Sequence, residues 1–254
     1  MKLGKIGEYE FVAEPFHCDF SHQLMLGHLG NSMLNAADYH SNDRGYGMEY
    51  LNTVHRTWVL SRLAIEMERM PKAYDKFKIA TWVESAMKYF TSRNFAVMSA
   101  DGRPLGYGRS IWAMIDTDTR QPVDILAVRD GLISEYIETD QPCPICKSSR
   151  VKIDDDVELV RSVSTYYSDV DVNGHVNSVK YIEHVLDLFD IDFYKTHRLK
   201  RMDVAYVAES HQGDLLNFYV QQMGDTHIIR ITKSSCSKTE EVEVVRVSMD
   251  FIKE

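Results

Sequence analysis

The sequence has few cysteines, no excess of positive charge and no long apolar run. Four cysteines in 254 residues are too few for a disulfide framework, so we expect a reduced, cytoplasmic protein. The 38 acidic and 29 basic residues give a formal net charge of −9, which disfavours nucleic acid as a partner. The N-terminus lacks the apolar core of a signal peptide, and no segment is apolar for long enough to span a membrane.

Two stretches have the periodicity of amphipathic helices, with apolar residues at spacings of three and four. The first runs through Leu26, Leu29, Met33 and Ala37. The second runs through Val176, Val179, Ile182, Leu186 and Phe189. Each pattern predicts a helix that buries one stripe against a core.

Most of the remaining chain has the pattern of β-strands. Residues 80–84, 95–98 and 105–115 are rich in aromatic and β-branched side chains, and Asp101-Gly102 predicts a hairpin turn between the last two. Near the C-terminus, residues 216–220 and 242–251 alternate between apolar and polar. The pair Val244-Val245 breaks that alternation and predicts a β-bulge.

The predicted elements occur twice in the order helix, then several strands. Gly27-His28 opens the first helix and Gly174-His175 opens the second, which aligns His28 with His175. This repetition predicts an α+β protein made of two copies of one unit, residues 1–140 and 141–254. Residues 121–160 form the connector, with a short helix expected at 126–137.

The densest polar cluster lies at residues 168–177, directly before the second predicted helix. Asp, Asn and Gly favour turns and helix caps, so a purely structural role is one interpretation. The other is catalytic, because a helix N-terminus carries unpaired N–H groups that can polarise a carbonyl. A neighbouring carboxylate can activate water or attack directly. These are the groups that hydrolysis of an acyl group requires.

The segment Asp-Val-Asn-Gly-His-Val-Asn-Ser-Val-Lys-Tyr-Ile at 171–182 closely resembles the signature of the acyl-acyl carrier protein thioesterases of plants and bacteria. Residues 58–62, 81–83 and 110–116 resemble the N-terminal half of that family, in the same order. The resemblance implies two tandem hotdog domains, each a long helix wrapped by an antiparallel sheet. It also implies that the N-terminal domain holds the acyl chain and the C-terminal domain holds the catalytic residues.

The resemblance assigns catalytic roles to Asp171, Asn173, His175 and Glu209. Ser210 lies where plant members carry a cysteine, so we expect a carboxylate mechanism without a thiol nucleophile. In this scheme Glu209 or Asp171 activates water or attacks the thioester. Asn173 positions the nucleophile or the carbonyl, and His175 stabilises the leaving group.

Other features refine this expectation. The backbone amides near Val176 and Asn177 are expected to polarise the substrate carbonyl. His28 lacks a preceding Asp-x-Asn, so the first copy is expected to be catalytically silent. We expect no cofactor and no metal site, since the pair Cys143 and Cys146 has no second pair of ligands nearby.

The expected partner is an acyl carrier protein that bears a phosphopantetheine-linked acyl chain. The basic run Lys195, His197, Arg198, Lys200 and Arg201 is a candidate docking surface for this acidic partner, although a solvated loop is slightly favoured. Two alternatives are an acyl-CoA thioesterase and a non-catalytic acyl-binding hotdog protein. Two copies in one chain allow either a monomer or a homodimer.

Overall fold

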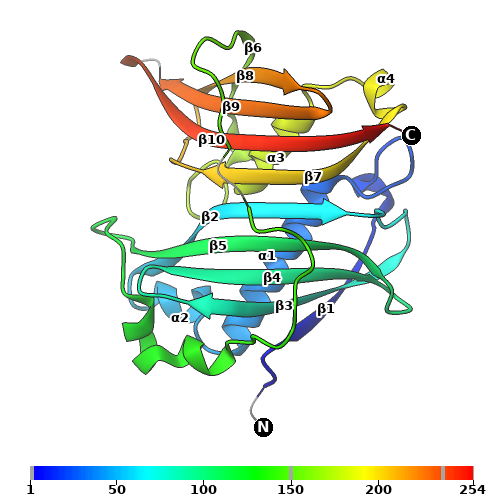
Figure 1. The fold of residues 1–254 in the computed structure, drawn as a ribbon. Coiled ribbons are helices and arrows are strands. Elements are labelled where there is room, and N and C mark those ends of the chain that lie inside the picture. Colours follow the sequence, from blue (N-terminus) through cyan, green and yellow to red (C-terminus); the bar gives the residue numbers. More distant parts are fainter. Residues whose placement is uncertain (1–2, 149–150, 236–237, 254) are drawn as a thin grey trace. The chain divides into compact units, whose positions relative to one another are not determined.

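The computed structural model describes residues 3–148, 151–235 and 238–253 (Figure 1). The chain divides into two compact units, Met1–Lys147 (unit 1) and Ser148–Glu254 (unit 2). Each unit combines helices with an antiparallel sheet, in agreement with the α+β prediction. Within the described ranges, every helix is too short or too polar to cross a membrane.

Unit 1 contains a sheet with the strand order β1 (Gly7–Val12), β3 (Lys76–Ala86), β4 (Phe90–Ser99), β5 (Pro104–Asp116), β2 (Arg56–Met67). Its helices are η1 (Pro15–His17), α1 (Leu26–Asp43), α2 (Met48–Asn52) and η2 (Ile125–Tyr136). The predicted stripe on α1 is confirmed, because Leu29, Met33 and Ala37 are buried. Gly108 on β5 permits this packing, since a Cβ there would lie 2.1 Å from the terminal methyl of Met33.

Unit 2 contains a sheet with the strand order β7 (His197–Tyr206), β10 (Lys238–Lys253), β9 (Thr226–Ser235), β8 (Leu215–Met223), β6 (Leu159–Ser164). Its helices are η3 (Tyr167–Asp169), α3 (Ser178–Leu186) and α4 (Ile191–Tyr194). Helix α3 packs on the sheet through aromatic contacts. Tyr181 meets Tyr206 of β7, and His184 meets Phe218 of β8.

The strand predictions are confirmed at 80–84 in β3, 95–98 in β4, 105–115 in β5 and 216–220 in β8. The predicted bulge is also present, because the register of β10 against β9 shifts between Glu243 and Val245. Burial of both Val244 and Val245 gives the reason for it.

Two helix predictions need correction. The second predicted stripe is too long, because Val176 and Phe189 lie outside α3. The Asp190 side chain accepts the Phe193 N–H at 2.8 Å and starts the separate helix α4. The expected connector helix is the 3-10 segment η2, which kinks where Arg129 and its two successors adopt left-handed backbone angles.

Candidate active site

A tight turn directly before α3 carries three of the predicted site residues. Val170 and Val176 pair across it as an isolated antiparallel bridge. Inside the bridge, the Asp171 N–H donates to the His175 carbonyl at 2.9 Å, and the Gly174 N–H donates to the Asp171 carbonyl at 3.0 Å. Gly174 has a φ of +80°, which glycine adopts without steric cost. The glycine therefore closes the turn and presents His175 beside the helix.

Asp171 makes a contact that belongs to the turn itself. Its Oδ1 accepts the N–H of Asn173 at 2.8 Å, as Asp side chains commonly do in turns. The tip of the turn is open to solvent, with Val172, Asn173 and Gly174 all exposed. The structural interpretation thus applies to Asp171, while the catalytic roles of Asp171 and Asn173 stay predictions.

His175 and Glu209 form an ion pair. The distance from His175 Nε2 to Glu209 Oε2 is 3.3 Å, and the two side chains are 22% and 34% exposed. An imidazole beside a carboxylate can take up, hold and return a proton, so the pair has the components of general acid-base chemistry. Partial exposure leaves the carboxylate accessible to a water molecule or a substrate.

The pair is assembled from two segments that hydrogen bonds hold together. Glu209 lies in the loop that follows β7. The Val176 N–H, next to His175, donates to the carbonyl of Ser210, next to Glu209, at 2.8 Å. On the other side, the Val207 N–H donates to the Val244 carbonyl at 2.8 Å. These backbone contacts set the separation of His175 and Glu209.

The predicted carbonyl-polarising amides are engaged elsewhere. The Val176 N–H donates to Ser210, and the Asn177 N–H donates to the Asp169 carbonyl at 2.8 Å. The Asn177 side chain caps α3 by accepting the Val179 N–H at 2.9 Å. Both donors thus serve the turn and the start of the helix, and their role toward a substrate carbonyl stays a prediction.

Ser210 is fully buried, with 0% of its surface exposed. It lies directly after Glu209 and supplies a hydroxyl at this position. A buried hydroxyl does not face an incoming thioester. The carboxylate of Glu209 is the accessible group on this segment.

Three further residues surround the pair, and sequence reasoning missed them. The His211 ring lies edge-on to His175, with ring centroids 5.0 Å apart. Asp214 accepts the His211 N–H at 2.9 Å. Lys233 donates to the Glu209 carbonyl at 2.6 Å and lies 3.4 Å from Asp214 Oδ2. His211 and Asp214 follow Glu209 closely in sequence, whereas Lys233 comes from β9 and gives no local signal.

Two residues of the basic run at 195–201 are engaged in local ion pairs. Lys195 pairs with Asp192 at 2.7 Å, and Arg201 pairs with Asp203 at 2.6 Å with only 12% of the arginine side chain exposed. Arg198 and Lys200 lie in the first half of β7. The 10 residues of β7 span about 33 Å and lead away from them to the loop of Glu209. The docking role of Lys195, Arg198, Lys200 and Arg201 stays a prediction.

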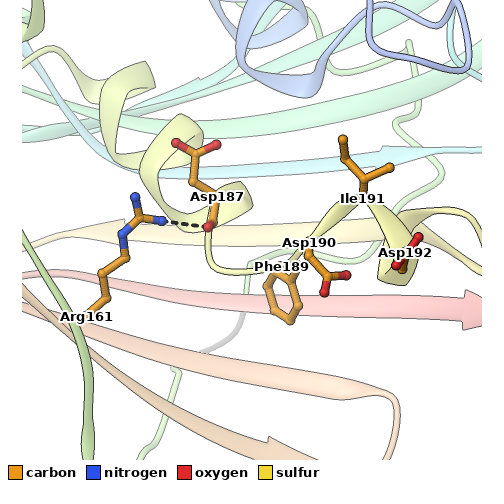
Figure 2. Close-up of a pocket in the computed structure, with 6 residues that line it drawn as sticks. All are labelled: Arg161, Asp187, Phe189, Asp190, Ile191 and Asp192. Atoms are coloured by element: carbon orange, nitrogen blue, oxygen red, sulfur yellow. Dashed lines mark hydrogen bonds between the residues drawn. The ribbon is translucent and has the colours of Figure 1, made fainter.

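A surface hollow near α4 is distinct from this site. Figure 2 shows Arg161 reaching toward Asp187, whose carbonyl accepts its guanidinium N–H at 2.7 Å. The lining residues are Arg161, Asp187, Phe189, Asp190, Ile191 and Asp192. None of them is a predicted site residue.

Unit 1 contains the same turn at a different position from the one that the sequence suggested. Cys18 and Leu24 form its isolated bridge, and the Leu24 N–H donates to the Pro71 carbonyl at 2.9 Å. This geometry places Gln23 at the position of His175 and Met70 at the position of Glu209. The alignment of His28 with His175 is therefore wrong, because His28 lies inside α1 whereas His175 precedes α3.

The two cysteines of the Cys143-x-x-Cys146 motif differ in burial. Cys143 is buried with its Sγ 3.8 Å from the Gly108 carbonyl, while Cys146 is exposed. Arg109 holds this segment by donating to the carbonyls of Cys143 at 2.8 Å and Ile145 at 3.0 Å. Among the described residues, no group of three or more His, Cys, Asp and Glu side chains is arranged to hold a metal ion.

Residues 8–136 match the protein family "Acyl-ACP thioesterase N-terminal domain", and residues 153–253 match the family "Acyl-ACP thioesterase C-terminal domain". The solved structure of an acyl-ACP thioesterase from Bacteroides thetaiotaomicron is 47% identical, has a TM-score of 0.89 and covers 98% of each chain. These matches span both units.

More distant proteins share the fold. The 12:0-ACP thioesterase from Umbellularia californica has a TM-score of 0.82 over 100% of both chains at 19% identity. The chloroplastic oleoyl-acyl carrier protein thioesterase 2 of Arabidopsis thaliana is 26% identical over 225 residues, which are 82% of this chain. The match spans 60% of that relative's length. The predicted α+β fold of tandem hotdog domains is confirmed.

Proposed function

The chain belongs to the acyl-ACP thioesterase family, and on this premise we propose that it hydrolyses fatty acyl-acyl carrier protein to a free fatty acid and the carrier protein. The substrate is a fatty acyl chain in thioester linkage to the phosphopantetheine arm of the carrier. Release of the acid ends chain growth on that carrier. The names of the matched relatives support the carrier-bound thioester as the substrate.

The observation that carries this proposal is the contact between His175 Nε2 and Glu209 Oε2 at 3.3 Å. The two residues come from separate segments, and both remain partly accessible. Hydrolysis of a thioester needs a base that can take a proton from water beside the carbonyl carbon. In unit 2, this pair offers such a base, with His175 on the turn before α3 and Glu209 on the loop hydrogen-bonded to it.

In the proposed reaction, Glu209 accepts a proton from water while the water oxygen bonds to the thioester carbonyl carbon. The C–S bond of the tetrahedral intermediate then breaks, and the leaving thiolate takes up the proton. His175 orients the carboxylate and stabilises charge beside the departing sulfur. Asn173, at the exposed tip of the turn, orients the water or the carbonyl with its amide.

Glu209 is a better base than Asp171 on geometric grounds. The Asp171 Oδ1 already accepts the N–H of Asn173 at 2.8 Å, so this carboxylate is engaged in forming the turn. The Glu209 carboxylate contacts an imidazole through Oε2. Alternatively, Glu209 attacks the thioester carbonyl carbon directly, which expels the thiolate and forms a mixed anhydride that water then hydrolyses. In this covalent mechanism Glu209 is again the reacting carboxylate.

The test is thiol release from acyl carrier protein thioesters of graded chain length, with the matching coenzyme A thioesters in parallel. We expect turnover on the carrier-bound series. Faster turnover on the coenzyme A series would identify an acyl-CoA thioesterase instead. Binding of acyl carrier protein without thiol release would identify a non-catalytic acyl-binding protein.

Three variants test the roles. Glu209→Gln should lower kcat by at least about 100-fold, because the amide cannot accept the proton. Asp171→Asn should retain more activity, since an amide oxygen still accepts the Asn173 N–H. Ser210→Ala serves as the control and should keep most activity. Loss of turnover in Ser210→Ala together with retention in Glu209→Gln would refute the carboxylate scheme.

A further inference from the structure

The segment that carries Glu209 is fixed at several backbone positions. Before Glu209, the Val207 N–H donates to the Val244 carbonyl at 2.8 Å. After it, the Ser210 carbonyl accepts the Val176 N–H at 2.8 Å, and the His211 N–H donates to Asp214 Oδ2 at 2.9 Å. The carbonyl of Glu209 itself is held by a side chain rather than by backbone.

That side chain is Lys233 of β9. Its ammonium group donates to the Glu209 carbonyl at 2.6 Å and lies 3.4 Å from Asp214 Oδ2. The Lys233 side chain is 23% exposed and the Asp214 side chain 12% exposed, so solvent screens this contact only partly. A hydrogen bond from a charged donor is stronger than one between neutral groups. Lys233 therefore restrains the peptide from which the Glu209 side chain projects.

Unit 1 provides a natural comparison for this lysine, because it repeats the surrounding backbone contacts. The Lys72 N–H donates to Asp75 Oδ2 at 2.9 Å, as the His211 N–H does to Asp214. The Ala13 N–H donates to the Asp75 carbonyl at 2.9 Å, as the Thr165 N–H does to Asp214 at 2.9 Å. The loop thus reaches the same backbone conformation in both units.

The lysine itself is specific to unit 2. In unit 2, Lys233 lies opposite Leu216, the second residue of β8. In unit 1, Ser99 lies opposite Phe77, the second residue of β3. The Ser99 hydroxyl instead donates to the Arg103 carbonyl in its own turn at 3.0 Å. The turn forms with serine at this position, so backbone formation alone does not require the lysine.

We propose that Lys233 is a positioning residue for the thioesterase reaction. Its ammonium group holds the Glu209 carbonyl, so that the Glu209 carboxylate stays against His175. The inference rests on the proposed function, because it assigns Lys233 to the same site. Lys233 acts through Glu209 and does not contact the reacting atoms. A small displacement of a reacting group lowers a rate by up to about 100-fold.

The test is a double-mutant cycle on the full chain with long-chain acyl carrier protein thioesters. Lys233→Met should lower kcat about 10- to 100-fold with KM little changed, because the reacting group moves while substrate contacts remain. Lys233→Arg, which keeps the charge and the donors, should recover part of the loss. In a Glu209→Gln background, Lys233→Met should have no further effect.

The controls separate this inference from simpler explanations. Lys78→Met on β3 removes a lysine that pairs with Glu10 at 3.3 Å and should leave kcat unchanged. Thermal unfolding of each variant shows that it is folded, and Lys233→Gln replaces Lys233→Met in the cycle if the latter does not fold. An unchanged kcat in Lys233→Met, or an equal loss in the Glu209→Gln background, would overturn the inference. An inactive wild-type chain would overturn the proposed function instead.

Discussion

Unit 1 and unit 2 each place a short 3-10 helix, a tight turn and a longer helix in succession. The turns are closed by the same bridge and by the same hydrogen bond to a following loop, from Leu24 to Pro71 at 2.9 Å and from Val176 to Ser210 at 2.8 Å. Both turns also contain one residue with a left-handed backbone, His22 with φ +60° and Gly174 with φ +80°. The backbone scaffold is therefore common to the two units.

The side chains on that scaffold differ. Unit 1 carries Gln23 and Met70 where unit 2 carries His175 and Glu209. A neutral amide and a thioether cannot exchange a proton, whereas an imidazole and a carboxylate can. The comparison teaches that the turn supplies the geometry in both units, while the ionisable pair that we propose for catalysis occurs in one.

A large effect on kcat is expected when His175 of unit 2 is replaced by glutamine, the residue at the matching position of unit 1. His175→Gln should lower kcat on acyl carrier protein thioesters about 100-fold, because the amide keeps a polar contact but loses the imidazole. Steady-state thiol release measures the loss. The matched variant Gln23→Ala in unit 1 should keep wild-type kcat, and equal losses in both would break the comparison.

The next effect concerns the left-handed residue in each turn. Gly174→Ala should lower the free energy of unfolding by about 1 kcal/mol, since a Cβ is disfavoured at that φ although no atom lies within 4 Å of it. Chemical denaturation measures the change. The reverse substitution in unit 1, His22→Gly, should be less costly than Gly174→Ala, and a larger loss there would contradict this assignment.

A change of similar size in the free energy of unfolding is expected when the N-cap residues of α1 and α3 are replaced. The Asn177 side chain caps α3, whereas Met25 caps α1 without a side-chain hydrogen bond. Asn177→Ala should lower the free energy of unfolding by about 1 kcal/mol, and Met25→Asn should raise it by about 0.5 kcal/mol. Thermal unfolding of the two variants tests both directions. No gain in stability for Met25→Asn would show that the N-termini of α1 and α3 differ in more than the residue at the cap.

The smallest effect is expected from transferring the pair. Gln23→His with Met70→Glu, introduced into the Glu209→Gln background, should restore at most about a tenth of the wild-type kcat, because unit 1 has Ser99 in place of Lys233. Thiol release over long incubation detects any gain. Recovery beyond that level would mean that the ionisable pair alone is sufficient on this scaffold.

Local pattern in the sequence predicted much of the fold. The stripe Leu29, Met33 and Ala37 predicted the buried face of α1, and Val244-Val245 predicted the bulge in β10. These features depend on neighbours along the chain, so spacing reveals them. The end of α3 at Leu186 escaped prediction because the apolar spacing continues to Phe189.

The site was harder to predict because its parts meet through the fold. The resemblance identified His175 and Glu209, and the structure brings them to 3.3 Å. The Gly-His dipeptides misled the alignment of the two units, since His28 matches in letters but not in its place relative to the helix. The sequence also did not reveal that the turn itself uses the amides of Val176 and Asn177 as donors. Lys233 lies on a distant strand and became visible only through its contact with Glu209.

The most direct test of the central claim compares kcat of Glu209→Gln and Met70→Gln on a long-chain acyl carrier protein thioester, with thermal unfolding to confirm that both are folded. The two substitutions introduce the same side chain at matching positions of the two units. The account predicts a loss of at least about 100-fold for Glu209→Gln and activity close to wild type for Met70→Gln. Near-normal activity of Glu209→Gln, or an equal loss in both variants, would contradict the account.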